Sequence, residues 1–292
     1  MTLYRITLQL RSPLLTPLKG DTLWGHIVWG IANHEGDEGA AEFLALEKGD
    51  SPALVVSSAF PEATLCRPIP EPQERGRTPL DADSYARIKL NKKTKYVPAA
   101  RYLEGIPETE PKSADPFQSV QVLHNTIDRG SGTVLEGGLY PLREKWARVP
   151  NWDIYILSSF SAGRLKELCE WAFENGYGAD ASTGKGKITI QTEPQEVRAK
   201  KNGDSYMALG PFVKDGGNGI AGLRGDIFIR SGRLGGAFAA TKPPYKKTVV
   251  LYEEGAVFTA EKPLQFAGRM LPDMHGDSRI CQSAFAPVLP VS

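Results

Sequence analysis

The chain has 292 residues, with 35 Lys or Arg and 34 Asp or Glu, so its net charge of +1 does not by itself favour any class of partner. A hydrophobic content of 41% predicts a real core, while 30 Gly and 22 Pro predict many turns and argue against an all-helical fold. Three scattered cysteines argue against a disulfide framework or a zinc site and favour a reducing cytoplasm. We expect no secretory leader and no membrane span.

The first elements follow directly from the periodicity of the apolar residues. Residues 2–11 alternate between apolar and polar, which predicts a strand with one face in the core. Asp21 occupies the place of a helix cap, and the apolar stripe over 23–31 predicts a helix that places Trp24 in the core. A short strand is expected at 54–56.

Residues 61–116 are rich in proline, polar and basic, with little sustained periodicity. A loop of this length is uncommon inside a compact domain, so we expect an insertion that protrudes. Between Arg75 and Arg101, eight basic residues stand against two acidic ones, with Tyr85 and Tyr96 interleaved and Tyr102 directly after. This pattern is typical of a groove for single-stranded nucleic acid, and equally of a solvated run of charge.

Regular structure resumes after the insertion. The predicted elements are strands at 118–124, 152–160 and 187–192, a turn region at 130–138 and a helix at 164–174. Together with the first strand and helix they have the order β-α-β…β-α-β of a ferredoxin-like (RRM-like) unit over residues 1–195.

The segment 176–187 lies between the predicted helix and strand and contains four glycines, two hydroxyl side chains and two lysines. Without Cβ atoms, its backbone N–H groups could approach a phosphate closely, and the lysines would add charge. The order helix–loop–strand is that of neither a Walker loop nor a Rossmann fingerprint, which favours a phosphodiester chain over a nucleotide triphosphate. The alternative is a flexible hairpin without a ligand.

Beyond residue 195 the apolar runs are shorter. The predicted strands are 206–212, 226–230, 247–252, 256–260 and 279–289. We interpret residues 196–292 as a second, degenerate copy of the first unit. The fold class is therefore α+β, with two ferredoxin-like domains in tandem, of which the first carries the long basic insertion.

Several separated segments resemble one family. They are Thr16–His26 (TPLKGDTLWGH), Ser57–Glu62 (SSAFPE), His124–Arg129 (HNTIDR) with Gly138–Tyr140 (GLY), and Gly184–Gly186 (GKG). Their order resembles that of the RAMP superfamily of CRISPR proteins, and more closely that of the Cas5-like subunit of type III-A (Csm) effector complexes.

The resemblance implies an RNA-binding structural subunit that needs neither a metal nor a cofactor and has no catalytic residues. Its relatives grip the 5′ handle of the CRISPR RNA and cap the foot of the complex. There they hold the large polymerase-like subunit and the first backbone RAMP subunit. RNA and DNA cleavage belong to other subunits.

The resemblance assigns RNA contacts to four regions. The glycine-rich loop would hold phosphates through Gly178, Ser182, Thr183, Gly184, Lys185, Gly186 and Lys187. The insertion would contact RNA through Arg87, Lys89, Lys92 and Lys93. Lys19 and the following helix N-terminus would form a second phosphate site, unless Lys19 is merely exposed and Asp21 only caps. Asn125 and Arg129, beside Asp128, would contact bases or a 2′-hydroxyl, or would brace the turn or contact a partner protein.

Two alternatives remain open at this stage. A metal-independent endoribonuclease of the same superfamily would mature precursor RNA with His26 and either Lys19 or Tyr177. A structural adaptor would contact protein and touch RNA only incidentally.

Overall fold

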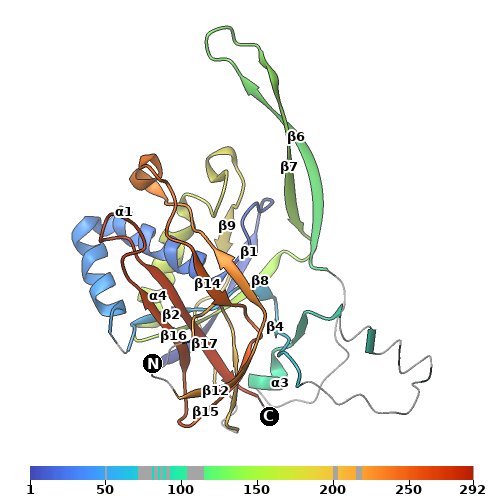
Figure 1. Ribbon diagram of the computed structural model, residues 1–292, viewed down its shortest axis with the longest axis vertical. Coiled ribbons are helices and arrows are strands. Elements are labelled where there is room, and N and C mark those ends of the chain that lie inside the picture. Colours follow the sequence, from blue (N-terminus) through green and yellow to red (C-terminus); the bar gives the residue numbers. More distant parts are fainter. Residues whose placement is uncertain are drawn as a thin grey trace.

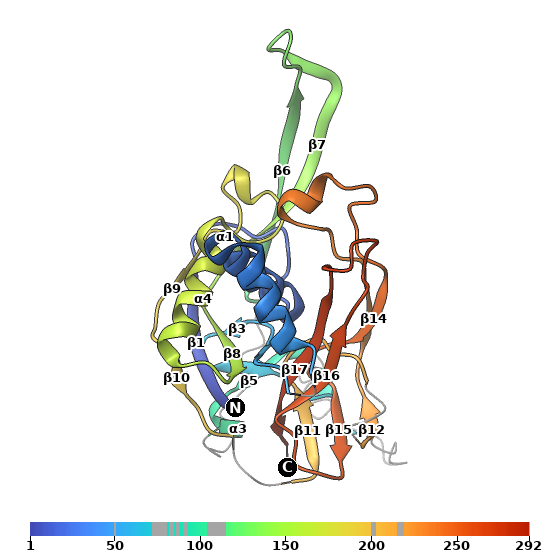
Figure 2. The same cartoon turned by 90° about the vertical axis from the view of Figure 1, so that its left-hand side faces the viewer.

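A computed structural model describes residues 1–49, 51–71, 81, 85, 88–89, 93–103, 115–199, 203–214 and 219–291. Two antiparallel sheets form the body, two helices pack together beside the first sheet, and a long two-stranded ribbon projects from one end (Figure 1; Figure 2). No helix in these ranges is long and apolar enough to span a membrane.

The first sheet is built around two antiparallel central strands. They are β1 (Thr2–Leu10) and β8 (Asn151–Ser158), joined in register with Ile6 opposite Ile154. The outer strands are β2 (Leu54–Val56) and β3 (Phe60–Pro61) beside β8, and β9 (Ile188–Ile190) and β10 (Gln195–Glu196) beside β1. The order β9–β1–β8–β2 confirms the strands predicted at 2–11, 54–56, 152–160 and 187–192.

The helices α1 (Gly20–Glu47) and α4 (Ala162–Glu174) pack against each other. Both predicted helices are confirmed, but α1 is longer than expected and breaks at Gly36, where φ is +76°. A straight helix would separate residues 24 and 43 by roughly 28 Å. The rings of Trp24 and Phe43 are instead 6.2 Å apart, so α1 folds back on itself, with Trp24 in the core as predicted.

The second sheet comes from the C-terminal part of the chain, in the order β12–β15–β11–β17–β16. Its strands are β11 (Ser205–Ala208), β12 (Ile220–Arg224), β15 (Val257–Ala260), β16 (Phe266–Leu271) and β17 (Gln282–Pro290). A separate pair consists of β13 (Ile227–Arg230) and β14 (Val249–Tyr252). The described residues of this part contain no α-helix, only the 3₁₀ turn η2 (Gly236–Ala240).

The α+β class is therefore confirmed, with mostly antiparallel sheets and few helices. The tandem ferredoxin-like arrangement and the boundary at residue 195 stay predictions. Met270, Cys281 and Phe285 of the C-terminal part belong to the same apolar cluster as the α1 side chains, so the two parts share one core.

The ribbon consists of β6 (Phe117–Ile127) and β7 (Val134–Ala147), which pair with each other and, among the described residues, have one further backbone bridge, from Lys145 to Leu14. The described part of the insertion predicted at 61–116 contains two regular features. They are the antiparallel pair of β4 (Thr64–Cys66) with β5 (Tyr96–Pro98), and the short helix α3 (Ala100–Leu103). The projecting arm of the described chain is thus the ribbon that follows the insertion (Figure 1). The sequence pattern did not distinguish its strands from those of a sheet in the body.

Candidate nucleic-acid interface

The glycine-rich loop is folded against the segment that follows β1. The Gly186 N–H donates to the Pro13 carbonyl at 2.9 Å, and the Lys187 N–H donates to Ser12 Oγ at 2.8 Å. The Ala179 N–H donates to Thr16 Oγ1 at 2.9 Å. These amides are satisfied within the protein, so the loop is an ordered structural element.

Its glycines meet conformational and steric demands. The φ angles of Gly176, Gly178, Gly184 and Gly186 are all positive. A Cβ on Gly178 would lie 2.5 Å from the Thr16 side chain, and one on Gly186 would lie 1.9 Å from the Tyr177 carbonyl oxygen. Close packing of the loop on itself and on Thr16 therefore explains these two glycines without a ligand.

His26 lies beneath this loop and holds it. The Gly178 N–H donates to His26 Nε2 at 3.1 Å, and the His26 ring lies 4.7 Å from that of the fully buried Tyr177. Burial lowers the pKa of His26 to about 4, so the ring is neutral at pH 7 and accepts the amide hydrogen. The Gly178 N–H, which we predicted to bind phosphate, therefore donates to His26, the residue that the nuclease alternative makes catalytic.

The predicted residues divide into an exposed edge and a packed underside. Ser182, Thr183, Gly184 and Lys187 are exposed, whereas Gly186 is buried. The Thr183 hydroxyl donates to the Asp180 carbonyl at 2.9 Å, which turns it into the loop. The Gly184 N–H also donates within the loop, to the Ala181 carbonyl at 3.0 Å, so the polar groups that this edge offers to a ligand include the side chains of Ser182 and Lys187.

Lys185 connects the loop to the ribbon. Its ammonium group forms an ion pair with Glu144 of β7, whose side chain is 2% exposed and also accepts from Trp146 Nε1 at 3.0 Å. The hydrogen bond from Lys185 lowers the pKa of Glu144 below its usual value. Lys185 is thus used within the protein, and it places the exposed edge of the loop beside the base of the ribbon.

Lys19 is also paired. Its Nζ lies 2.8 Å from Glu254 Oε1 and 3.6 Å from Glu253 Oε1, over the ring of Phe228. The first N–H group of α1, that of Gly20, donates to Ser58 Oγ at 3.3 Å. The predicted second phosphate site is therefore filled by protein carboxylates.

Asp21 does not cap the helix, which corrects the sequence interpretation. α1 begins at Gly20, with Lys19 in the cap position two residues before Asp21, so Asp21 falls in the first turn. It is buried, accepts from Gln282 Nε2 at 3.0 Å and pairs with Arg230 Nε at 3.0 Å. Its role is to join α1 to the second part of the chain.

The ribbon carries the predicted cluster near its tip. Asn125 and Arg129 are exposed, and Asp128 accepts from the Gly130 and Ser131 amides at 2.7 and 2.8 Å. These hydrogen bonds lower the pKa of Asp128. The bracing role that the sequence left open is thus the one observed for Asp128.

The sequence interpretation missed the apolar surface of the ribbon. Leu123, Ile127, Val134 and Leu139 are between 55% and 63% exposed. Leu139 is paired with Asn125 and Leu123 lies two residues before it, so both share its face; Ile127 pairs with Val134 beyond a shift of the register. A patch of this kind marks an interaction surface. The alternation of apolar residues was visible in the sequence, but alternation alone does not reveal that a strand leaves the body.

The four basic residues predicted in the insertion are only partly described. Lys89 and Lys93 are exposed, while Arg87 and Lys92 lie outside the described residues.

No family model matches the sequence, and no curated protein matches it. Solved structures match along its full length. One is a chain of the Csm1–Csm4 cassette in complex with AMPPNP, at 16% identity and a TM-score of 0.60, with 99% of this chain and 98% of the other covered. Another is a chain of the Csm3–Csm4 subcomplex of the type III-A CRISPR–Cas interference complex, at 11% identity and a TM-score of 0.57, with both chains fully covered.

The chain has the fold of a type III CRISPR–Cas subunit. A chain of the type III-B Cmr-β complex, bound to cognate target RNA and AMPPnP, also matches at 11% identity and a TM-score of 0.52, with 87% and 86% covered. The chain thus shares its fold with chains of Csm and Cmr complexes, as the sequence resemblance implied.

Proposed function

We propose that this chain is the Cas5-like subunit of a type III-A interference complex and that it binds the 5′ handle of the CRISPR RNA at the foot of the complex. One observation carries the proposal: the fold matches chains of the Csm1–Csm4 and Csm3–Csm4 assemblies from end to end. Within that role, the large polymerase-like subunit and the first backbone subunit are its protein partners, and the cytoplasm is its location.

The exposed edge of the glycine-rich loop is the proposed RNA contact. Ser182 and Lys187 present a hydroxyl group and a cation there, and the Lys185–Glu144 pair holds this edge beside the ribbon. Glu144 pairs with Val120 and Asn125 with Leu139, so by strand alternation the loop adjoins the face of the ribbon opposite Asn125, and Asn125 is a separate proposed contact near the tip. The proposed RNA contact does not use the Gly178 and Gly186 amides, since both donate within the protein.

Recognition without cleavage is the activity that this geometry favours. The proposed nuclease needs His26 to exchange a proton, but His26 accepts the Gly178 N–H and its pKa is lowered by burial to about 4. Tyr177, its possible partner, is fully buried and donates to the Pro17 carbonyl at 2.6 Å. We therefore propose a structural subunit with no catalytic residues of its own.

The fold supports a finer assignment of the first part of the chain. Its order strand–helix–strand–strand–helix–strand, with β9–β1–β8–β2 antiparallel throughout, fits a ferredoxin-like unit. We assign residues 1–195 to this unit, and residues 196–292 to a degenerate second unit that has kept its sheet.

Gel shifts of the reconstituted complex would test the proposal, with RNA that carries the handle and RNA that lacks it. We expect the Ser182→Ala/Lys187→Ala variant to bind handle-bearing RNA about tenfold more weakly, because one phosphate contact and one hydrogen bond are lost. Lys262→Ala, at an exposed position of the second part, is the matched control. Equal affinity of the wild-type complex for both RNAs would refute handle recognition.

A further inference from the structure

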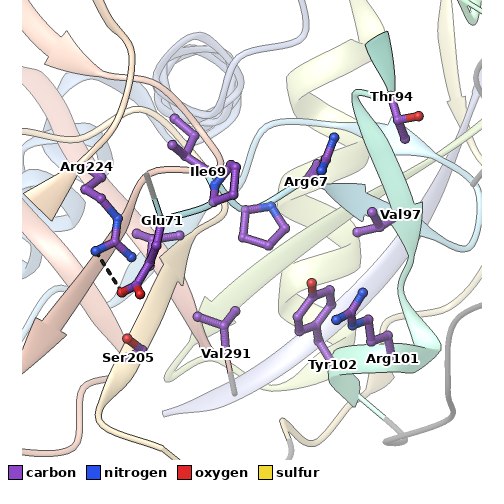
Figure 3. Close-up of a pocket in the computed structure, with 13 residues that line it drawn as sticks. Arg67, Ile69, Glu71, Thr94, Val97, Arg101, Tyr102, Ser205, Arg224 and Val291 are labelled. Atoms are coloured by element: carbon purple, nitrogen blue, oxygen red, sulfur yellow. Dashed lines mark ion pairs between the residues drawn. The ribbon is translucent and has the colours of Figure 1, made fainter. Parts of the chain in front are cut away.

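A cavity of 510 Å³ lies between the base of the insertion and the edge of the second sheet (Figure 3). It shares no residue with the glycine-rich loop or the ribbon. Its wall combines polar groups, which form the larger part of its surface, with the apolar residues Pro68, Ile69, Pro70, Val97, Val257 and Val291. A volume of this size is typical of sites for small ligands.

The charge that lines the cavity is positive. Arg67 follows β4, Arg101 lies in α3 and Arg224 ends β12, so three distant segments each contribute an arginine to the lining. Among the described lining residues, Glu71 is the one carboxylate. Convergence of several cations on one cavity favours an anionic ligand.

Arg224 is the arginine whose surroundings are incomplete. Its Nη1 lies 3.1 Å from Glu71 Oε1, whereas its buried Nε has no hydrogen-bond partner within the described chain. The Glu71 side chain is 78% exposed, and an ion pair with so exposed a partner is weak. A ligand oxygen bound to Nε would satisfy the buried donor, and phosphate oxygens suit the fork of an arginine.

The remaining groups suit the other parts of a nucleotide. The guanidinium carbon of Arg101 lies 5.5 Å from the centroid of the Tyr102 ring, and the two side chains lie side by side in Figure 3. Aromatic rings and guanidinium planes are the surfaces on which nucleobases stack. Thr94 and Ser205 add hydroxyl groups to the lining.

We propose that this cavity binds a nucleotide, with Arg224 as the ligand of its phosphate and the Arg101–Tyr102 pair beside its base. The nucleotide is either free or one unit of an RNA strand, since both present the same phosphate chemistry. The proposal does not depend on handle binding, because it concerns a different surface and is tested with the isolated chain.

Calorimetric titration of the full chain at low salt tests this with adenosine monophosphate, adenosine and inorganic phosphate. We expect the monophosphate to bind, phosphate to bind more weakly and adenosine to bind weakest. Arg224→Met should weaken monophosphate binding about tenfold, because a charge-assisted hydrogen bond is lost. Glu71→Gln should tighten it, because the competing carboxylate is gone. Arg269→Met, at an exposed position of β16, should bind like the wild type.

The two variants should change the affinity for the monophosphate in opposite directions, which separates a binding role of Arg224 from a structural one. If Glu71→Gln weakens binding as much as Arg224→Met, the pair only supports the fold and the proposal fails. It also fails if the wild type shows no saturable binding at millimolar monophosphate. Should Arg224→Met not fold, Glu71→Gln alone carries the test. A 5′-phosphorylated trinucleotide that competes for the site distinguishes the two sources of the nucleotide. If the trinucleotide binds more tightly than the monophosphate, the site belongs to RNA. If it binds more weakly, the site belongs to a free nucleotide.

Discussion

Gly186 lies so close to Tyr177 that an added Cβ would meet the Tyr177 carbonyl oxygen at 1.9 Å, on a backbone with φ +65°. Gly184, two residues earlier, has φ +86° and open space around the position of a Cβ. The two glycines share a conformation but not an environment, so one is needed for packing and the other only for its backbone angle.

This difference predicts unequal costs of substitution. Gly186→Ala should lower the free energy of unfolding by more than about 3 kcal/mol, because strain and a backbone clash add. Gly184→Ala should cost only about 1–2 kcal/mol, which is the strain of a left-handed residue with a side chain. Urea denaturation of the full chain measures both. Equal costs would contradict the packing role given to Gly186.

Glu47 is a buried carboxyl group at the end of α1. It accepts from Trp24 Nε1 at 3.2 Å and from the Leu54 N–H at 2.9 Å. Burial raises its pKa from 4.5 to about 7, although both hydrogen bonds act in the opposite direction. The folded protein thus holds a proton here at a pH where the unfolded chain has released it.

The raised pKa of Glu47 makes the stability of the protein depend on pH. The contribution of Glu47 to the free energy of unfolding is fully present below pH 4.5 and is lost as the pH rises towards 7 and above. Glu47→Gln cannot ionise, so the stability of this variant relative to the wild type should rise between pH 4.5 and 8 by up to about 3 kcal/mol. Denaturation of both proteins across this range measures the difference. A difference that does not change with pH would show that the pKa of Glu47 is not raised.

At the scale of elements, the glycine-rich loop and the base of the ribbon are attached to each other and to the body. The Lys185–Glu144 pair and the backbone bridge between Leu14 and Lys145 fasten the base of the ribbon to the body. Beyond this base, β6 and β7 have only each other within the described residues. Phe117 also stacks on Trp152, with ring centroids 4.7 Å apart, so the direction of the ribbon is set by contacts at its base.

Lys185→Met would leave Glu144 buried without its cation. We expect a loss of about 1–3 kcal/mol and faster amide hydrogen exchange at residues 142–146, because an unpaired buried charge is costly. Lys187→Met, at an exposed neighbour in the same loop, should change stability by less than about 0.5 kcal/mol. Hydrogen exchange at the ribbon base that is the same in both variants would exclude the anchoring role.

At the scale of the whole molecule, buried polar groups join the two parts of the chain. Asp21 of α1 binds Arg230 of β13 and Gln282 of β17, and Gln282 Oε1 accepts from Lys246 Nζ at 2.9 Å. Lys19 adds its pair with Glu254. These contacts and the shared apolar core lead us to expect that both parts unfold together.

Asp21→Asn tests this coupling. It removes the charge opposite the largely buried Arg230 and should cost about 2–3 kcal/mol, with separate transitions appearing in calorimetry if the parts come apart. Asp277→Asn, which removes an exposed pair with Arg279, should leave the unfolding midpoint nearly unchanged. An Asp21→Asn variant as stable as the wild type would mean that the shared apolar core alone joins the two parts.

The order of strands and helices in the first part could be read from the sequence, because local periodicity and turn residues decide which segments become strands or helices. The strand predicted at 2–11 and the helix predicted at 164–174 match β1 and α4 closely. The strands β12 and β16 escaped prediction, since Gly222 and Gly268 interrupt their apolar patterns.

Local composition also identified the glycine-rich loop, but not how its groups are used. Whether the amides of Gly178 and Gly186 face a ligand or the protein depends on His26 and Pro13, which are more than 150 residues away in the chain. The same holds for Lys19 and Lys185, whose carboxylate partners are distant in sequence. The charge and flexibility of a segment depend on its own residues. Pairing, burial and the pKa shifts that follow from burial depend on which distant segments the fold brings together.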